Sequence, residues 1–237
     1  MKYPEDYINK IIQGDCLEIM KGIPDNSVDL VVTSPPYNVG KNNMTENKYK
    51  KGDKMSQEEY YLWSKRVIDE MLRISKTSFY NIQMLSDNKR TVLSLLGEYK
   101  NSIKDIIIWN KNQVAPAIEP GVMNSKFEFI IIFSNDRPEK RKFMDGNFRG
   151  NFSNVITGNN ASGNKYSDIH RATFPSYLPD TLISNFSKEG DIVLDMFIGI
   201  GTTAESCKNL NRKFIGIELD EEYCQVARDR LKQQILL

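Results

Sequence analysis

Asp195-Met196-Phe197-Ile198-Gly199-Ile200-Gly201-Thr202-Thr203 is a segment with two closely spaced glycines, and the architecture of this chain can be inferred from it. Apolar residues 192–194 precede the segment and are typical of a buried strand, and residues 204–210 follow it with helical spacing. A strand, a glycine turn and a helix in this order form a ligand site at the carboxyl edge of a doubly wound sheet. The sequence therefore predicts an α/β fold with a largely parallel sheet.

The residues around the glycines indicate which kind of ligand the predicted site binds. Residues 213–218 read as the next strand, and it ends in Glu218, an acid that can bind both hydroxyls of a ribose. The spacing Gly199-x-Gly201-x-x-Ala204 also satisfies a loose NAD fingerprint. However, the Asp195 carboxylate would face the pyrophosphate of NAD. A carboxylate favours a cationic, amino-bearing ligand such as S-adenosylmethionine.

A second motif, Thr33-Ser34-Pro35-Pro36-Tyr37, directly follows the apolar residues 28–32. Two consecutive prolines fix a stiff, extended turn at the end of a strand. The Ser34 hydroxyl and the Pro35 carbonyl can accept hydrogens from an exocyclic amino group, and the Tyr37 ring can stack on a planar base. The motif therefore predicts a pocket for the amino edge of a nucleobase.

These two motifs, in this order, resemble those of the amino-group DNA methyltransferases of restriction-modification systems, which methylate N4 of cytosine or N6 of adenine. Gly14-Asp15-Cys16 resembles the family's adenine-contacting turn, and residues 170–175 resemble the lead-in to a helix beside the cofactor methionine. The order, with the catalytic turn first and the glycines last, resembles the β group, which is a circular permutation of the usual sheet. The resemblance implies a Rossmann-like methyltransferase fold, with residues 1–237 forming a single catalytic domain.

The resemblance also implies functional residues. The expected catalytic residues are Ser34, Pro35, Pro36 and Tyr37. The expected contacts to S-adenosylmethionine are Asp15, Cys16, Phe174, Asp195, Phe197, Gly199, Gly201, Thr202, Thr203 and Glu218. The family usually has a proline and a serine where this chain has Met196 and Ile200, which keep the turn apolar.

The implied reaction is transfer of a methyl group from S-adenosylmethionine to the exocyclic amino group of a base flipped out of the duplex. Serine at position 34 resembles the cytosine-N4 members, whereas adenine-N6 members more often carry aspartate there. We therefore expect cytosine N4 as the target, with adenine N6 as the alternative. An RNA or protein-glutamine methyltransferase, an NAD-dependent oxidoreductase and an inactive nucleic-acid-binding module remain open.

Contacts to double-stranded DNA are expected from local basic patches, because the net charge of the 237 residues is only +1. One patch lies in a predicted mobile loop at about residues 38–56, and another in a predicted target-recognition insertion at about 137–170. Residues 147–169, rich in Asn, Gly and Ser, are expected to lack regular structure. The predicted DNA contacts are Lys41, Lys48, Lys50, Lys51, Arg141, Lys142 and Arg149.

The rest of the chain reads as scaffold. Helical spacing covers residues 57–74 and 87–99, and strand patterns cover 77–83, 103–110 and 127–133. Trp109-Asn110-Lys111 lies at the end of one predicted strand, and its tryptophan is either part of the core or a wall of the base pocket.

Three cysteines without Cys-x-x-Cys spacing indicate neither a disulfide framework nor a zinc site, and a single histidine cannot form a metal cluster. No metal is therefore expected. The absence of a signal peptide or membrane-spanning run favours a cytoplasmic protein without a membrane partner. The family resemblance adds a homodimer and a cognate restriction endonuclease as further partners to test.

Overall fold

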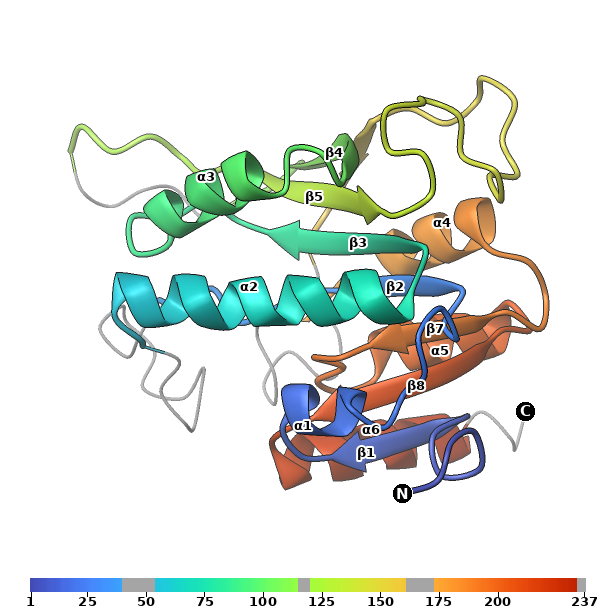
Figure 1. Ribbon diagram of the computed structural model, residues 1–237. Helices are drawn as coiled ribbons and strands as arrows, with labels where there is room; N and C mark the ends of the chain where they lie inside the picture. The colour runs from blue at the N-terminus through green and yellow to red at the C-terminus, as the bar shows by residue number, and fades with distance from the viewer. Residues whose placement is uncertain (40–53, 115–119, 161–172, 234–237) are drawn as a thin grey trace.

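The computed structural model describes residues 1–39, 54–114, 120–160 and 173–233, and these contain one eight-stranded sheet with helices on both faces (Figure 1). Neighbouring strands are parallel, except that β5 is antiparallel to both β3 and β4. In spatial order the strands are β1 (Lys10–Gln13), β8 (Lys213–Glu218), β7 (Ile192–Asp195), β2 (Leu30–Thr33), β3 (Thr77–Ile82), β5 (Phe127–Ser134), β4 (Ile103–Lys111) and β6 (Val155–Gly158).

Two apolar cores lie on the two faces of the sheet, because successive strand side chains point to opposite faces. Val31 packs into the first core, whereas Leu30 and Val32 pack into the second. The first core is covered by α1 (Cys16–Met20), α2 (Gln57–Ile74) and α3 (Lys89–Glu98). The second is covered by α4 (Tyr177–Phe186), α5 (Thr202–Asn209) and α6 (Glu221–Gln233). None of the helices in the described part of the chain has the length and apolarity needed to cross a membrane.

The sheet changes direction between β7 and β2. These two strands are parallel neighbours, with Leu30 opposite Val193, although about 160 residues separate them in the chain. From β7 the chain continues to β8 on one side, and from β2 it continues to β3 on the other. Ligands of open α/β sheets bind at such a switch point, outside the carboxyl ends of the strands.

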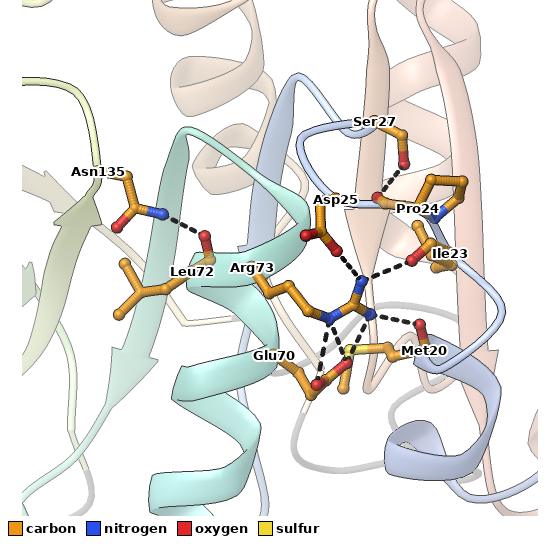
Figure 2. Close-up of polar contacts among 9 residues, drawn as sticks. All are labelled: Met20, Ile23, Pro24, Asp25, Ser27, Glu70, Leu72, Arg73 and Asn135. Atoms are coloured by element: carbon orange, nitrogen blue, oxygen red, sulfur yellow. Dashed lines mark hydrogen bonds and ion pairs between the residues drawn. The ribbon is translucent and has the colours of Figure 1, made fainter.

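Arg73, near the carboxyl end of α2, anchors the loop that leads into β2 (Figure 2). Its Nη1 donates to the Ile23 carbonyl at 2.8 Å and to the Asp25 carboxylate at 2.7 Å. Its Nη2 donates to the Met20 carbonyl at 2.8 Å and to the Glu70 carboxylate at 2.7 Å. One side chain therefore fixes the path of the chain from α1 into β2, the strand that leads into residues 33–37, the predicted catalytic turn.

The structure confirms the α/β fold and the strand and helix positions expected from the sequence, with shifts of a few residues at their ends. The expectation that residues 147–169 lack regular structure was wrong. Residues 155–158 form β6, which pairs with the edge of β4, Trp109 lying opposite Ile156. This four-residue strand has a burial pattern that alternates only between exposed and half-buried, so its sequence carries little apolar signal.

Candidate active site

Asp195, at the end of β7, joins the two motifs that the sequence placed far apart. Its Oδ1 accepts hydrogen bonds from the Thr33 hydroxyl at 2.7 Å and from the Phe197 amide at 3.1 Å. Its Oδ2 accepts from the Thr203 hydroxyl at 2.7 Å. The residue is 3% exposed, and burial raises the pKa of its carboxyl to about 6 in spite of these hydrogen bonds. Asp195 thus ties the catalytic turn, the glycine turn and the start of α5 together.

The glycine turn requires glycine for two separate reasons. Gly199 and Gly201 have left-handed backbones, with φ of +51° and +86°. A Cβ atom at Gly201 would also lie 3.0 Å from the Cβ of Ala227 on α6. Met196 and Ile200, at the positions where the family resemblance predicts proline and serine, are each 1% exposed.

Thr202 and Thr203 begin α5, as expected, but both hydroxyls are committed to other protein groups. Thr203 donates to Asp195, and Thr202 accepts from Nη1 of Arg230 at 3.1 Å. Arg230 also forms an ion pair with Glu205 in α5. The two threonines therefore hold the helix start in place, and any contact of theirs to a ligand stays a prediction.

Glu218, at the end of β8, is half-buried beside the glycine turn. Its carboxylate accepts from the Gly199 amide at 3.0 Å and from the Asp220 amide at 2.9 Å. Burial raises the pKa of this carboxyl, and the backbone hydrogen bonds oppose that shift. A fixed carboxylate at this position is suited to binding ribose hydroxyls.

Asp15 is exposed at the carboxyl end of β1 and caps α1, with Oδ1 accepting from the Leu17 amide at 2.8 Å. Cys16 is 6% exposed, and burial raises the pKa of its thiol to about 12. Phe174 is half-buried against the second core. His170 lies outside the described residues, as does most of the segment before Phe174.

An aromatic wall from α2 connects the two turns. The Trp63 ring lies 5.6 Å from that of Phe197 and is stacked on Tyr60 at 5.9 Å. The Tyr60 hydroxyl donates to the Pro36 carbonyl at 2.7 Å. Tyr60 is buried, whereas the next residue, Tyr61, is only half-buried. The aromatic spacing of positions 60 and 63 could have indicated this wall.

The catalytic turn presents two acceptors. The Pro35 carbonyl accepts no hydrogen bond from any described residue. Ser34 Oγ lies 2.9 Å from the Tyr37 hydroxyl, which donates to Glu128 Oε2 at 2.8 Å. Asn81 Nδ2 lies 2.7 Å from both the Tyr37 oxygen and Glu128 Oε2. Tyr37 therefore uses its hydroxyl in a polar network, and stacking of its ring on a base stays a prediction.

Asn81 and Glu128 were not predicted as site residues, because both lie inside apolar strand patterns. Lys111 was named only as part of the segment that contains Trp109. The Lys111 ammonium donates to Glu128 Oε1 at 3.0 Å, and both residues are 7% exposed. Trp109 itself is core, 4% exposed, with Nε1 donating to the Tyr177 hydroxyl at 2.7 Å. A charged residue in a strand of Ile and Phe was the available signal for Glu128.

The base of the predicted mobile loop is closed by a reciprocal pair of hydrogen bonds. Asn38 Nδ2 donates to the Met55 carbonyl at 3.1 Å, and the Met55 amide donates to Asn38 Oδ1 at 2.6 Å. Residues 40–53, including Lys41, Lys48, Lys50 and Lys51, lie outside the described residues.

The other predicted basic patch is not brought to the catalytic turn. Strand β5 runs antiparallel and ends with Ser134 opposite Thr77, at the amino end of β3. The segment that follows stays at this edge, where the Asn147 amide donates to the Asn185 carbonyl near the end of α4 (Figure 1). The predicted DNA contacts Arg141, Lys142 and Arg149 lie in this segment, together with Arg137 and Lys140.

A different segment stands at the carboxyl edge beside the catalytic turn. It connects β4 to β5 and is fixed to the end of β3 by a hydrogen bond from Gln83 to Ser125 at 2.8 Å. Its Val122 and Met123 are 53% and 90% exposed. Residues 115–119 of this segment lie outside the described residues.

Known proteins match this chain over most of its length. A family model described as DNA methylase, for N6 and N4 methyltransferases, matches residues 28–229. The Type II methyltransferase M.BglII of Bacillus subtilis is 31% identical over 258 residues, which cover 95% of this chain and 69% of M.BglII.

Two solved structures have the same fold. The PvuII DNA methyltransferase, titled cytosine-N4-specific, has a TM-score of 0.73 at 18% identity and covers 95% of this chain and 89% of its own. M1.HpyAVI, solved as a complex with SAM, has a TM-score of 0.64 at 26% identity and covers 94% of this chain and 98% of its own.

Proposed function

This chain belongs to the family of N6 and N4 DNA methylases, and on that premise we propose that its own target is N4 of cytosine in double-stranded DNA. It is an S-adenosylmethionine-dependent methyltransferase that acts on an exocyclic amino group in DNA. This membership removes the NAD-dependent oxidoreductase from consideration. The choice of cytosine is supported by the neutral Ser34 in the first catalytic position, which resembles the cytosine-N4 members.

The hydrogen bond between Thr33 and Asp195 is the observation that supports direct methyl transfer at this site, whichever of the two bases is the target. This hydrogen bond holds the catalytic turn, with its acceptors on Ser34 and Pro35, next to the glycine turn that is suited to the methyl donor. Adjacent sites for donor and acceptor are what a direct transfer between two bound molecules requires.

The residues of the glycine turn fit S-adenosylmethionine. Glu218 would hold the ribose hydroxyls, and Phe197 with Trp63 would provide an apolar wall for the adenine. The bound cofactor supplies an electrophilic methyl group on a sulfonium. Asp15, exposed at the end of β1, is near enough in the sheet to Glu218 to share this site, because Gln13 pairs with Glu218.

The catalytic turn would act on the amino group. Ser34 Oγ and the Pro35 carbonyl accept its two hydrogens, which favours a pyramidal nitrogen whose lone pair is no longer delocalised into the ring. With the methyl donor bound, the nitrogen would form its bond to the methyl carbon as the bond from carbon to sulfur breaks and a neutral thioether leaves. The surplus proton on the nitrogen would then pass to solvent. The base has to leave the duplex first, at a cost of a few kcal/mol.

The experiment is to incubate the protein with methyl-labelled S-adenosylmethionine and unmodified duplex DNA, and to identify the labelled nucleoside by mass. We expect N4-methylcytosine in the wild type and a large loss of label in Ser34→Ala. N6-methyladenine would overturn the choice of base and keep the mechanism. Label on RNA or protein glutamine but not on DNA would overturn the DNA substrate.

A homodimer and a cognate restriction endonuclease belong to the same proposal, because the relatives are named type II methyltransferases. Sedimentation equilibrium at micromolar concentration tests the dimer. Protection of methylated DNA against an endonuclease encoded beside this protein tests the second partner.

A further inference from the structure

A buried ion pair lies directly behind the catalytic turn and takes no part in the reaction described above. Glu128 is the second residue of the antiparallel strand β5, and Lys111 ends the neighbouring strand β4. Their side chains are each 9% exposed, with Nζ and Oε1 3.0 Å apart. Taking two charges out of water is costly, so such a pair gives little net stability. The groups that contact this ion pair therefore indicate what it does.

The hydrogen positions in this cluster follow from counting donors. An ionised carboxylate only accepts, so the single proton of the Tyr37 hydroxyl is used by Glu128 at 2.8 Å. Tyr37 then has no proton left for Ser34. The contact of 2.9 Å between Ser34 and Tyr37 must accordingly use the serine proton.

The orientation of Asn81 supports this count. Its Nδ2 faces both Glu128 and the Tyr37 oxygen, each at 2.7 Å, while its buried Oδ1 has no partner among the described residues. Reversing the amide would place Oδ1 against the carboxylate of Glu128. Tyr37, Asn81 and Lys111 all donate to the Glu128 carboxylate. Asn81 keeps this orientation although it leaves its own Oδ1 without a donor among the described residues.

We propose that Glu128, through Tyr37, fixes Ser34 as a hydrogen-bond acceptor toward the target base and so selects bases that carry an amino group. This rests on the proposed function, in which Ser34 meets the target base. With its proton directed to Tyr37, Ser34 presents only lone pairs to the pocket. An amino group of cytosine or adenine donates to them, whereas the carbonyl of thymine or guanine meets an acceptor. Glu128 and Lys111 are positioning residues, because neither touches the base.

Glu128→Gln tests this with almost no change in shape. Lys111 donates and therefore attracts the glutamine carbonyl, which turns the amide N–H toward Tyr37. Tyr37 then accepts from position 128 and donates to Ser34, and the serine proton is released toward the pocket. We expect kcat for DNA methylation to fall about 100-fold, the size found when one transition-state hydrogen bond is lost. The KM for S-adenosylmethionine should stay unchanged, and Glu189→Gln, at an exposed site, should retain full activity. The midpoint of thermal unfolding should fall in Glu128→Gln, because Lys111 loses its buried counter-charge, so all variants are assayed well below that lowered midpoint.

A double-mutant cycle distinguishes a polarity effect from a general disturbance. In a Ser34→Ala background, Glu128→Gln should lower the residual rate by less than about twofold, because the group that it acts through is gone. Equal effects in both backgrounds would overturn the proposal.

A second measurement does not depend on DNA. In protein labelled at the tyrosine ¹³Cζ, the Tyr37 resonance is assigned by its disappearance in Tyr37→Phe. Donation to a carboxylate moves this resonance downfield, and an accepted hydrogen bond moves it upfield. Glu128→Gln should therefore shift it upfield, and Ser34→Ala should shift it downfield. An upfield shift in Ser34→Ala would show that Tyr37 donates to the serine and would overturn the proposal, whether or not the protein methylates DNA.

Discussion

At the scale of single residues, Asp195 has the greatest effect on the site. Its three hydrogen bonds reach Thr33, Phe197 and Thr203, and it is enclosed on all sides. A buried carboxylate with these partners orders two turns at once. Burial also gives the Asp195 carboxyl a higher pKa in the folded chain than in the unfolded chain.

The raised pKa of Asp195 predicts how stability changes with pH. Between about pH 4 and the folded pKa of about 6, the folded state holds a proton that the unfolded state has lost. The contribution of Asp195 to the free energy of unfolding therefore falls as pH rises through this interval, by about 3 kcal/mol in total, and stays constant above it. Asp195→Asn removes this titration.

Urea unfolding of both proteins without cofactor at pH 4, 5, 6 and 7 measures this effect. The free energy of the wild type relative to Asp195→Asn should decline from pH 4 to 6. Parallel curves would show that the carboxyl keeps an ordinary pKa in the folded protein.

At the scale of secondary-structure elements, the connection between α1 and β2 depends on Arg73. The Glu70 carboxylate raises the pKa of its guanidinium and pairs with it, while two carbonyls of the connection accept its remaining hydrogens. The helix α2 thereby both covers the first core and sets the entry of the chain into β2.

We predict that Arg73→Met lowers the free energy of unfolding by about 2–3 kcal/mol, because the carbonyls of Met20 and Ile23 lose a charged donor. Lys188→Met is the matched control, since Lys188 and its partner Asp145 are each 63% exposed, and it should cost less than about 1 kcal/mol. Chemical denaturation measures both. Equal losses of unfolding free energy in the two variants would mean that the contacts of Arg73 stabilise the protein no more than an exposed ion pair does.

At the scale of the whole molecule, the antiparallel strand β5 determines which loops can reach the substrate. It carries the chain from the carboxyl edge, at Phe127, to the amino edge, at Ser134. The connection between β4 and β5 therefore stands beside the catalytic turn, and the segment after β5 stands at the other end of the sheet (Figure 1). The insertion predicted at residues 137–170 is divided, because β6 then returns toward the carboxyl edge.

This division predicts an unequal role for the two basic patches. Replacing Arg141, Lys142 and Arg149 together by alanine should change DNA affinity by less than about threefold and leave its salt dependence unaltered, since each lost phosphate contact would reduce the slope by about 0.9. Replacing Lys48, Lys50 and Lys51, which the sequence places next to the catalytic turn, should reduce both. Fluorescence anisotropy over a range of salt concentrations measures this, and a shallower slope in the first variant would show that the amino edge binds DNA.

The sequence by itself determined the fold class, the backbone of both turns and the family, because these depend on short segments whose residue types act locally. Prolines set the backbone of one turn, glycines that of the other, and apolar spacing marked the strands between them. Only the tertiary structure decided which distant groups meet. Pairing of β2 with β7 brought Asp195 to Thr33, and the reversed direction of β5 placed Glu128 behind Ser34 and moved Arg141 away. Strand order and direction are settled by packing across the whole sheet, and no local pattern in the chain records them.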